Sequence, residues 1–308
     1  MRILVVGAGA TGGYFGGRLA QAGRDVTFLV RPARAEQLRA DGLRLVSPHH
    51  GDATLSPRLV TAGQITSPYD VALLSVKAFA LEAALDDLAP AVGPDTMVLP
   101  LLNGLRHLDT LTERFGEKPV LGGVCVVATM LDDAGRIVQL ADTQDLAYGE
   151  LNGVASARVG ALDQAMQGAG FTARASPVIA QEMWEKWVFL ATLGGITCLM
   201  RGTVGEIEAA PGGADLTRQL LAECAAVAAA SGHPAGEKAM ARIAATVTTP
   251  RSPLASSMYR DLQRERRVEA DHILGDLLAR ARRLAVPTPL LATAFASLSI
   301  YQRRVSAQ

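Results

Sequence analysis

The sequence predicts an α/β protein in which a domain of alternating strands and helices precedes an all-helical domain. A short aliphatic run at the N-terminus leads into a glycine-rich turn and a helix. Strand and helix patterns then alternate as far as residue 175, and nearly everything after Pro177 has helical period and alanine-rich composition. We therefore expect an N-terminal Rossmann-type dinucleotide-binding domain over residues 1–176 and a helical substrate and catalytic domain over residues 177–308.

The N-terminal turn carries Gly7, Gly9 and Gly12 in the spacing G-x-G-x-x-G. The first glycine permits a tight turn, the second lets backbone approach a pyrophosphate, and the third lets the next helix pack on the strand. The N-terminus of that helix, predicted over residues 11–22, presents free N–H groups and a positive dipole end to phosphates. We expect cofactor contacts from the whole turn: Gly7, Ala8, Gly9, Ala10, Thr11 and Gly12.

The second strand, predicted over residues 25–30, indicates which dinucleotide binds. NAD-specific enzymes carry an acidic residue about 20 positions beyond the fingerprint, where it binds the ribose hydroxyls. Here the strand ends in Arg31, and no acid stands in that place. A guanidinium suits a 2′-phosphate through bidentate, charge-assisted hydrogen bonds. The alternative is a loop arginine in solvent, but the missing carboxylate favours NADP(H).

The rest of the first domain reads as strands and helices in alternation. Aliphatic and β-branched runs predict strands, and 3.6-residue periodicity predicts helices. We expect strands over residues 42–46, 54–60, 71–76, 96–99 and 171–175, successive antiparallel strands over 120–130, 136–140 and 145–148, and helices over 33–40, 81–88 and 155–167.

Two polar residues follow buried strands of this domain, at the edge where open α/β sheets bind ligands. Lys77 comes just after the strand at 71–76, and Asn103 comes after the strand at 96–99, directly before Gly104. Lys77 is either a solvated loop residue or a contact to the dinucleotide. Asn103 is either part of a self-contained Asn-Gly turn or a hydrogen-bonding group aimed into the crevice.

In the second domain, Lys186 stands among apolar side chains on a helix predicted to begin near Val178. Met183, Trp184 and Trp187 surround it in the sequence. A partly desolvated lysine loses its proton more readily, which suits a general acid near neutral pH. Alternatively, Lys186 reaches solvent and pairs with Glu182 one turn earlier.

A second candidate group is Glu269, in a segment that leads from Ser256 into a helix ending near Leu284. Glu269, Ile273 and Leu277 recur every four residues, so the carboxylate lies along an apolar stripe. An acid on that side needs a partner, and Lys186 is a candidate.

Composition excludes several other classes of protein. The 30 basic and 30 acidic residues cancel, which argues against nucleic-acid or membrane-surface binding. The longest apolar stretch, residues 187–200, is too short to span a bilayer. Three scattered cysteines indicate reduced thiols in a cytoplasmic protein, and the five histidines read as surface or loop residues, so we expect no metal site. Apolar helix faces are compatible with a homodimer.

Together these motifs resemble the ketopantoate reductase (2-dehydropantoate 2-reductase) family nearly end to end. The most diagnostic groups are Glu182-Met-Trp-Glu-Lys186 and Ser256-Ser-Met with Glu269 twelve residues beyond Ser257. The resemblance implies NADPH-dependent reduction of ketopantoate to pantoate for pantothenate synthesis. It implies that Lys186 is the proton donor and that Ser257 binds substrate. Glu269, the second catalytic residue, would orient Lys186 or bind a substrate hydroxyl, and Asn103 would bind substrate and hold the reacting ends together. Asn103 and Glu269 would also contact the cofactor, as would Arg31 and Lys77.

One departure puts the substrate in doubt. Family members generally carry asparagines four and eight residues after the catalytic lysine, and this chain has Leu190 and Gly194 there. We therefore expect a more apolar and roomier pocket wall. The alternatives to a ketopantoate reductase are a paralogue that reduces a more apolar 2-oxo acid, and a non-enzymatic NADPH sensor.

Overall fold

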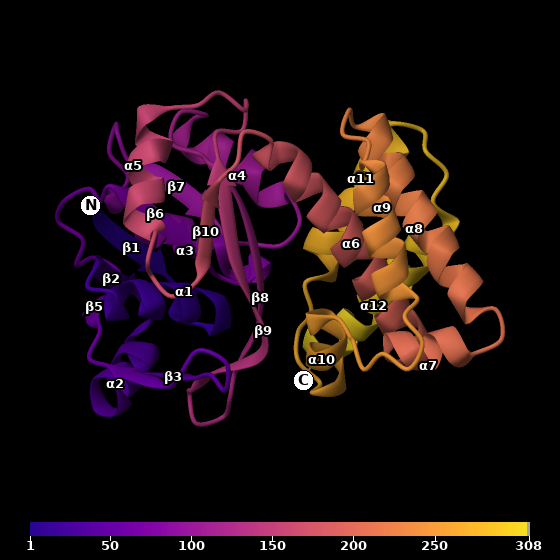
Figure 1. Cartoon of the computed structure of the whole chain (residues 1–308), viewed down its shortest axis with the longest axis horizontal. Coiled ribbons are helices and arrows are strands. Elements are labelled where there is room, and N and C mark those ends of the chain that lie inside the picture. Colours follow the sequence, from indigo (N-terminus) through magenta and orange to yellow (C-terminus); the bar gives the residue numbers. More distant parts are fainter. Residues whose placement is uncertain (307–308) are drawn as a thin grey trace. The chain divides into compact units, whose positions relative to one another are not determined.

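The computed structural model describes residues 1–306 and divides into two compact units (Figure 1). The first unit comprises residues 1–102 and 107–180, and the second comprises residues 103–106 and the chain from residue 181 onward. The last two residues of the predicted second domain lie outside the described residues. The short segment around Asn103 thus belongs with the helical part of the protein, although it follows a strand of the first unit.

The first unit contains a five-stranded parallel sheet with the order β5-β2-β1-β6-β7. Its strands are β1 (Arg2–Val6), β2 (Asp25–Leu29), β5 (Arg58–Val60), β6 (Val71–Leu74) and β7 (Met97–Pro100). The order runs outward from β1 through β2 on one side and through β6 on the other, so the topological switch point lies between β1 and β6. This confirms the predicted Rossmann-type arrangement.

A second, mixed sheet in the same unit has the order β10-β9-β3-β4, with β8 paired antiparallel to β9. Its strands are β3 (Leu43–Val46), β4 (Ala53–Leu55), β8 (Gly122–Leu131), β9 (Ile137–Gly149) and β10 (Thr172–Ala175). The strand predicted at 54–60 is therefore wrong as a single element, because β4 pairs with β3 while β5 joins the other sheet. Pro57 lies between β4 and β5. Proline has no backbone N–H to donate to a neighbouring strand, so it suits a position where strand pairing ends.

The strand β9 also corrects the sequence prediction. Residues 136–140 and 145–148 are predicted as separate strands, but they form one continuous strand of 13 residues. Residues 141–144, which lie between them, are assigned to no strand in the sequence prediction. They remain in the sheet because β8 pairs along both ends of β9, with a register shift between Val127 and Thr129.

The helices of the first unit are α1 (Ala10–Gln21), α2 (Pro32–Asp41), α3 (Leu81–Leu88), α4 (Arg106–Phe115) and α5 (Ala157–Met166), with the short helices η1 (Ala78–Ala80) and η2 (Ala89–Ala91). The sequence interpretation assigns no element to α4. Leu108, Leu111 and Phe115 recur there at helical spacing, and this pattern is the signal that indicates the helix.

Helix α1 lies between the two sheets and depends on glycines for its close approach to both. A Cβ atom at Gly16 would lie 2.8 Å from Val5 and from the Phe28 ring, on the parallel sheet. A Cβ atom at Gly17 would lie 3.1 Å from Leu43 and Leu45, on the mixed sheet. Glycines on two adjacent faces of α1 therefore let this one helix pack closely against both sheets.

The second unit is helical, as predicted. It contains α6 (Ile179–Met200), α7 (Val204–Ala209), α8 (Gly213–Ala230), α9 (Glu237–Val247), α10 (Ser257–Gln263), the π-helical turn η3 (Asp271–Gly275), α11 (Asp276–Arg283) and α12 (Pro289–Ser306). The segment that leads from Ser256 into the helix predicted to end near Leu284 contains the separate helix α10, after which Glu265 adopts a left-handed φ of 52°. Within residues 1–306, no helix is both long and apolar enough to cross a membrane.

We predict opposite effects for two glycine-to-alanine changes in helices of the first unit. Gly16→Ala should lower the free energy of unfolding by about 1 to 3 kcal/mol, because the added methyl group meets Val5 and Phe28. Gly160→Ala should raise it by about 0.5 to 1 kcal/mol, since Gly160 is exposed in α5 with open space around its Cβ position. Urea unfolding of both variants tests the packing of α1, and equal stability of the two would contradict it.

Candidate active site

The glycine fingerprint forms a tight turn between β1 and α1. Gly7 has a φ of 95°, and its N–H donates to the Leu29 carbonyl at 3.0 Å. A Cβ atom at Gly7 would lie 2.7 Å from the Ser75 carbonyl, and one at Gly12 would lie 2.8 Å from the Ser75 Cβ. Both positions therefore require glycine, because the turn packs against the residue that follows β6.

Gly9 differs from the other two glycines of the fingerprint. It is the N-cap of α1, and a Cβ atom built on it has no neighbour within 4 Å. The first turn of α1 carries no acidic side chain. Open space beside an uncapped helix N-terminus without nearby negative charge fits a pyrophosphate group. The geometry thus supports the cofactor site predicted for Gly7, Ala8, Gly9, Ala10, Thr11 and Gly12.

The two positively charged residues that are predicted to bind the cofactor lie on either side of this turn. Arg31 is the exposed N-cap of α2, directly after β2, and Lys77 is the exposed N-cap of η1, after β6. Because β2 and β6 flank β1 on opposite sides, Arg31 and Lys77 follow strands that lie on opposite sides of β1. Both stand at the carboxyl edge of the parallel sheet, where such folds bind ligands.

In the helical unit, one hydrogen bond joins the elements that carry the two predicted catalytic residues. The indole Nε1–H of Trp187 donates to the Ile273 carbonyl at 2.9 Å, and both groups are buried. Trp187 follows the partly buried Lys186 on α6, and Ile273 lies one turn beyond Glu269. Glu269 is only 8 % exposed, and its carbonyl accepts the N–H of Ile273 at the start of the π-helical turn. The prediction that Glu269 lies on the apolar side is confirmed.

The loop that carries Asn103 packs against the same π-helical turn. Gly104 has a φ of 77°, and a Cβ atom on it would lie 2.8 Å from the His272 carbonyl. A larger residue at this position would push the loop away from the turn. Asn103 therefore belongs to the helical unit with Lys186, Ser257 and Glu269, although the sequence interpretation placed it in the first domain.

His272 is a residue of this region that the sequence interpretation missed. It is 6 % exposed, and burial lowers its pKa despite Glu269 and Asp276, whose charges act in the opposite direction. Reading all histidines as surface or loop residues is wrong for His272 and for His107, which are both buried. The sequence signal for its burial is the position of His272 between Glu269 and the apolar Ile273.

Ser257 is the first residue of α10, and its position depends on the contacts of its neighbour Ser256. The Ser256 hydroxyl caps α10 by accepting the Tyr259 N–H at 3.0 Å, and it lies 2.9 Å from the hydroxyl of Thr197 on α6. Ser256 is buried, whereas Ser257 is exposed at the first helical position. The cap fixes the start of α10 to α6 and leaves the Ser257 hydroxyl accessible.

The structure corrects the expectation of a roomier pocket wall. Lys186, Leu190 and Gly194 recur every four residues on one face of α6. A Cβ atom at Gly194 would collide with the terminal methyl group of Met258, so the space beside this glycine is filled. Beside Gly194 this face of α6 therefore offers no additional room, and the more apolar character expected of it stays a prediction.

Among residues 1–306, no group of three or more histidine, cysteine, aspartate or glutamate side chains is arranged to hold a metal ion.

Comparison with known proteins identifies the family. The model of the ketopantoate reductase PanE/ApbA family matches residues 3–153, and that of its C-terminal domain matches residues 178–302. The chain belongs to the ketopantoate reductase family. Members of this family are NADPH-dependent oxidoreductases that act on CH–OH groups, so the predicted enzyme class and cofactor are confirmed.

Individual relatives cover the whole chain. An uncharacterized oxidoreductase, YkpB, from Bacillus subtilis is 36% identical over 98% of this chain and 99% of its own. A 2-dehydropantoate 2-reductase from Mesorhizobium japonicum is 30% identical over 94% of each chain. The crystal structure of 2-dehydropantoate 2-reductase from Methylococcus capsulatus superposes with a TM-score of 0.86, at 29% identity over 99% of this chain and 98% of that chain. Each of these relatives therefore matches both the nucleotide-binding and the helical part of the chain.

We predict that Arg31→Ala weakens NADPH binding by about 1.5 to 3 kcal/mol, as expected when a charged hydrogen-bonding group is lost. NADH binding should change little, because NADH lacks the 2′-phosphate. Isothermal titration with both dinucleotides measures the difference. Arg39→Ala, which removes an exposed arginine from the same helix, is the matched control. Equal weakening of NADPH and NADH would contradict the assignment of Arg31.

Proposed function

We propose that the protein reduces a 2-oxo acid to a 2-hydroxy acid with NADPH, and that ketopantoate, giving pantoate for pantothenate synthesis, is the default substrate. The hydrogen bond from Trp187 to the Ile273 carbonyl carries this proposal, because it joins the helix of Lys186 to the turn that follows Glu269. The packing of Gly104 on His272 adds the Asn103 loop to the same region. Four candidate residues from distant parts of the sequence thus belong to one helical unit.

In this proposal the polar residues of the helical unit act on the substrate. Bound NADPH supplies the hydride that the carbonyl carbon receives. The Lys186 ammonium stabilises the negative charge that develops on the carbonyl oxygen and then donates a proton from Nζ to it. Glu269 orients Lys186, and Ser257 and Asn103 donate hydrogen bonds to the substrate.

The residues of the first unit hold the cofactor. The fingerprint turn from Gly7 to Gly12 receives the pyrophosphate, and Arg31 binds the 2′-phosphate. Lys77 lies on the far side of β1 and contacts the dinucleotide there. Asn103 and Glu269 complete the cofactor contacts from the helical unit.

We predict that Lys186→Ala lowers kcat for ketopantoate by about 10²- to 10⁴-fold, the usual contribution of a general acid. NADPH affinity should stay near the wild-type value, because Lys186 acts on the substrate oxygen. Stopped-flow or steady-state assays give kcat, and fluorescence titration gives the affinity.

The matched control is Lys238→Ala, which removes an exposed lysine from α9 in the same unit. It should leave both quantities unchanged. A Lys186→Ala enzyme with full activity would disprove the catalytic assignment, and a wild-type protein inactive on every 2-oxo acid would return the sensor alternative to consideration.

A second candidate function is the reduction of a 2-oxo acid with a more apolar tail. Three observations favour it: Leu190 is one turn beyond Lys186, Gly194 is two turns beyond, and Met258 fills the space beside Gly194. These side chains cannot hydrogen-bond a substrate hydroxyl as asparagines can. A site without such groups discriminates weakly in favour of a hydroxylated substrate.

This second candidate predicts that kcat/KM for 4-methyl-2-oxopentanoate exceeds that for ketopantoate by about tenfold or more, the range expected from apolar pocket contacts. Leu190→Asn should shift the ratio toward ketopantoate, and Leu284→Asn, at an exposed site after α11, should not. Steady-state kinetics on both acids measure the ratio. A wild-type enzyme with by far its highest kcat/KM on ketopantoate would leave ketopantoate as the substrate.

A further inference from the structure

We propose that Arg34 is a positioning residue of the dinucleotide site, which holds the Ala8–Gly9 peptide in the orientation that receives the pyrophosphate. This inference rests on the proposed role of the fingerprint turn. It concerns a residue on α2, one turn beyond Arg31, that the comparisons and the catalytic proposal leave without a role.

The contacts of Arg34 begin at the fingerprint turn. Its Nε and Nη2 groups both donate to the Ala8 carbonyl, at 3.2 Å and 3.1 Å. Ala8 lies between Gly7 and Gly9, and its methyl group is buried in the core of the unit. Two donors from one planar guanidinium therefore fix the direction of this carbonyl.

The orientation of the Ala8 carbonyl determines that of the next N–H group. No peptide bond among the described residues is cis, so the Ala8 carbonyl and the Gly9 N–H are trans across one planar unit and point in opposite directions. Because Arg34 holds the carbonyl, the Gly9 N–H is directed away from α2. Gly9 is also the position with open space beside it. The donor is thus aimed before any phosphate arrives, which lowers the cost of binding.

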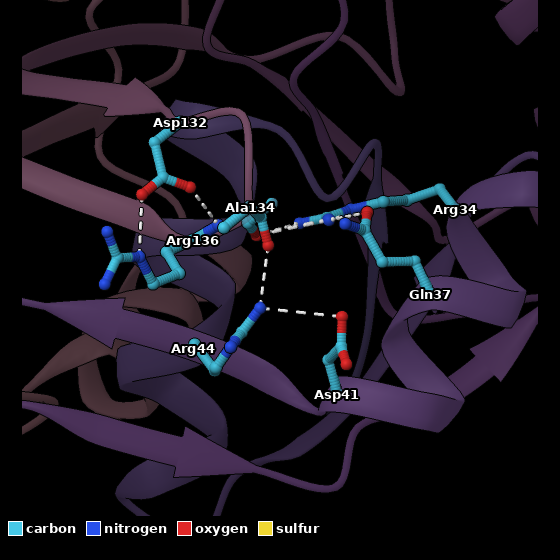
Figure 2. Close-up of polar contacts among 8 residues, drawn as sticks. Arg34, Gln37, Asp41, Arg44, Asp132, Ala134 and Arg136 are labelled. Carbon is cyan, nitrogen blue, oxygen red and sulfur yellow. Dashed lines mark hydrogen bonds and ion pairs between the residues drawn. The ribbon is translucent and has the colours of Figure 1, made fainter.

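Arg34 is itself held in place by the turn between β8 and β9 (Figure 2). Its Nη1 and Nη2 groups each donate to the Gly135 carbonyl at 3.2 Å, and Nη1 also donates to the Gln37 side chain at 2.5 Å. Gly135 has a φ of 72°, in the left-handed region that favours glycine, and this conformation presents its carbonyl to Arg34. The side chain is half-buried, and burial is the main cause that lowers its pKa.

These contacts separate the roles of the two arginines of α2. Arg34 directs its donors at backbone and amide oxygens of the protein, whereas Arg31 is exposed at the helix N-terminus. Arg31 is therefore suited to bind the 2′-phosphate of the cofactor, and Arg34 is suited to hold the fingerprint turn that receives the pyrophosphate. The two residues should affect different parts of the dinucleotide.

The test compares three ligands on Arg34→Met, which keeps an unbranched apolar stem and removes the guanidinium donors. NADPH and NADH should each bind about tenfold more weakly, as expected when charged hydrogen bonds that hold the site are lost. Adenosine 2′-monophosphate, which has the 2′-phosphate but no pyrophosphate, should bind as it does to the wild type. Arg34→Lys, which retains one donor group, should lose less affinity than Arg34→Met.

The matched control is Arg44→Met, which removes an arginine that contacts the same turn between β8 and β9. Arg44 donates to the Ala134 carbonyl at 2.7 Å and pairs with Asp41 at 3.5 Å (Figure 2). Neither of these contacts involves Ala8. This variant should retain wild-type affinity for all three ligands. If Arg34→Met does not fold, Arg34→Lys against Arg44→Lys replaces the comparison.

Three results would overturn the inference: unchanged dinucleotide affinity in the Arg34 variants, a loss confined to NADPH, or a parallel loss of adenosine 2′-monophosphate. The second would make Arg34 a ligand of the 2′-phosphate, and the third would indicate a general structural defect. Failure of the wild-type protein to bind NADPH would instead contradict the proposed function, so the two failures are distinguishable.

Discussion

The close approach of α1 to two sheets is the constraint on which the nucleotide-binding unit depends. Gly12 and Gly16 face the parallel sheet and Gly13 and Gly17 face the mixed sheet, so the helix backbone lies where side chains would otherwise separate the layers. This packing fixes the N-terminus of α1 at the end of β1. The fingerprint is therefore part of the core of the unit, and its position is set by the same contacts that stabilise the fold.

In the helical unit, the Trp187 indole has a comparable role. A buried N–H costs free energy unless it finds an acceptor, and the Ile273 carbonyl supplies one. The π-helical turn frees carbonyl groups from the regular helical pattern and is common at functional sites. Through this bond the polar residues on α6 and around Glu269 are positioned by the surrounding apolar core. The residues at 190, 194 and 258 lie on or beside the same helix and can vary without disturbing this bond.

Much of the architecture and the family could be predicted from local sequence. The fingerprint, Arg31 after the second strand, and the helical period beyond Pro177 are contiguous signals, and each reflects a requirement of the backbone or of one helix face. The burial of Glu269 also followed from its spacing with Ile273 and Leu277. Such features need no information about distant partners.

The two-part α/β and helical organisation, the dinucleotide fingerprint and the family can thus all be derived from the order of the residues. Four other features required the folded chain: residues 54–60 divide between two sheets, β9 is continuous, the Asn103 loop joins the helical unit, and Met258 fills the space beside Gly194. All four have the same cause. Strand pairing and side-chain packing depend on residues far apart in the chain, so the same local pattern is compatible with several partners until the core selects one.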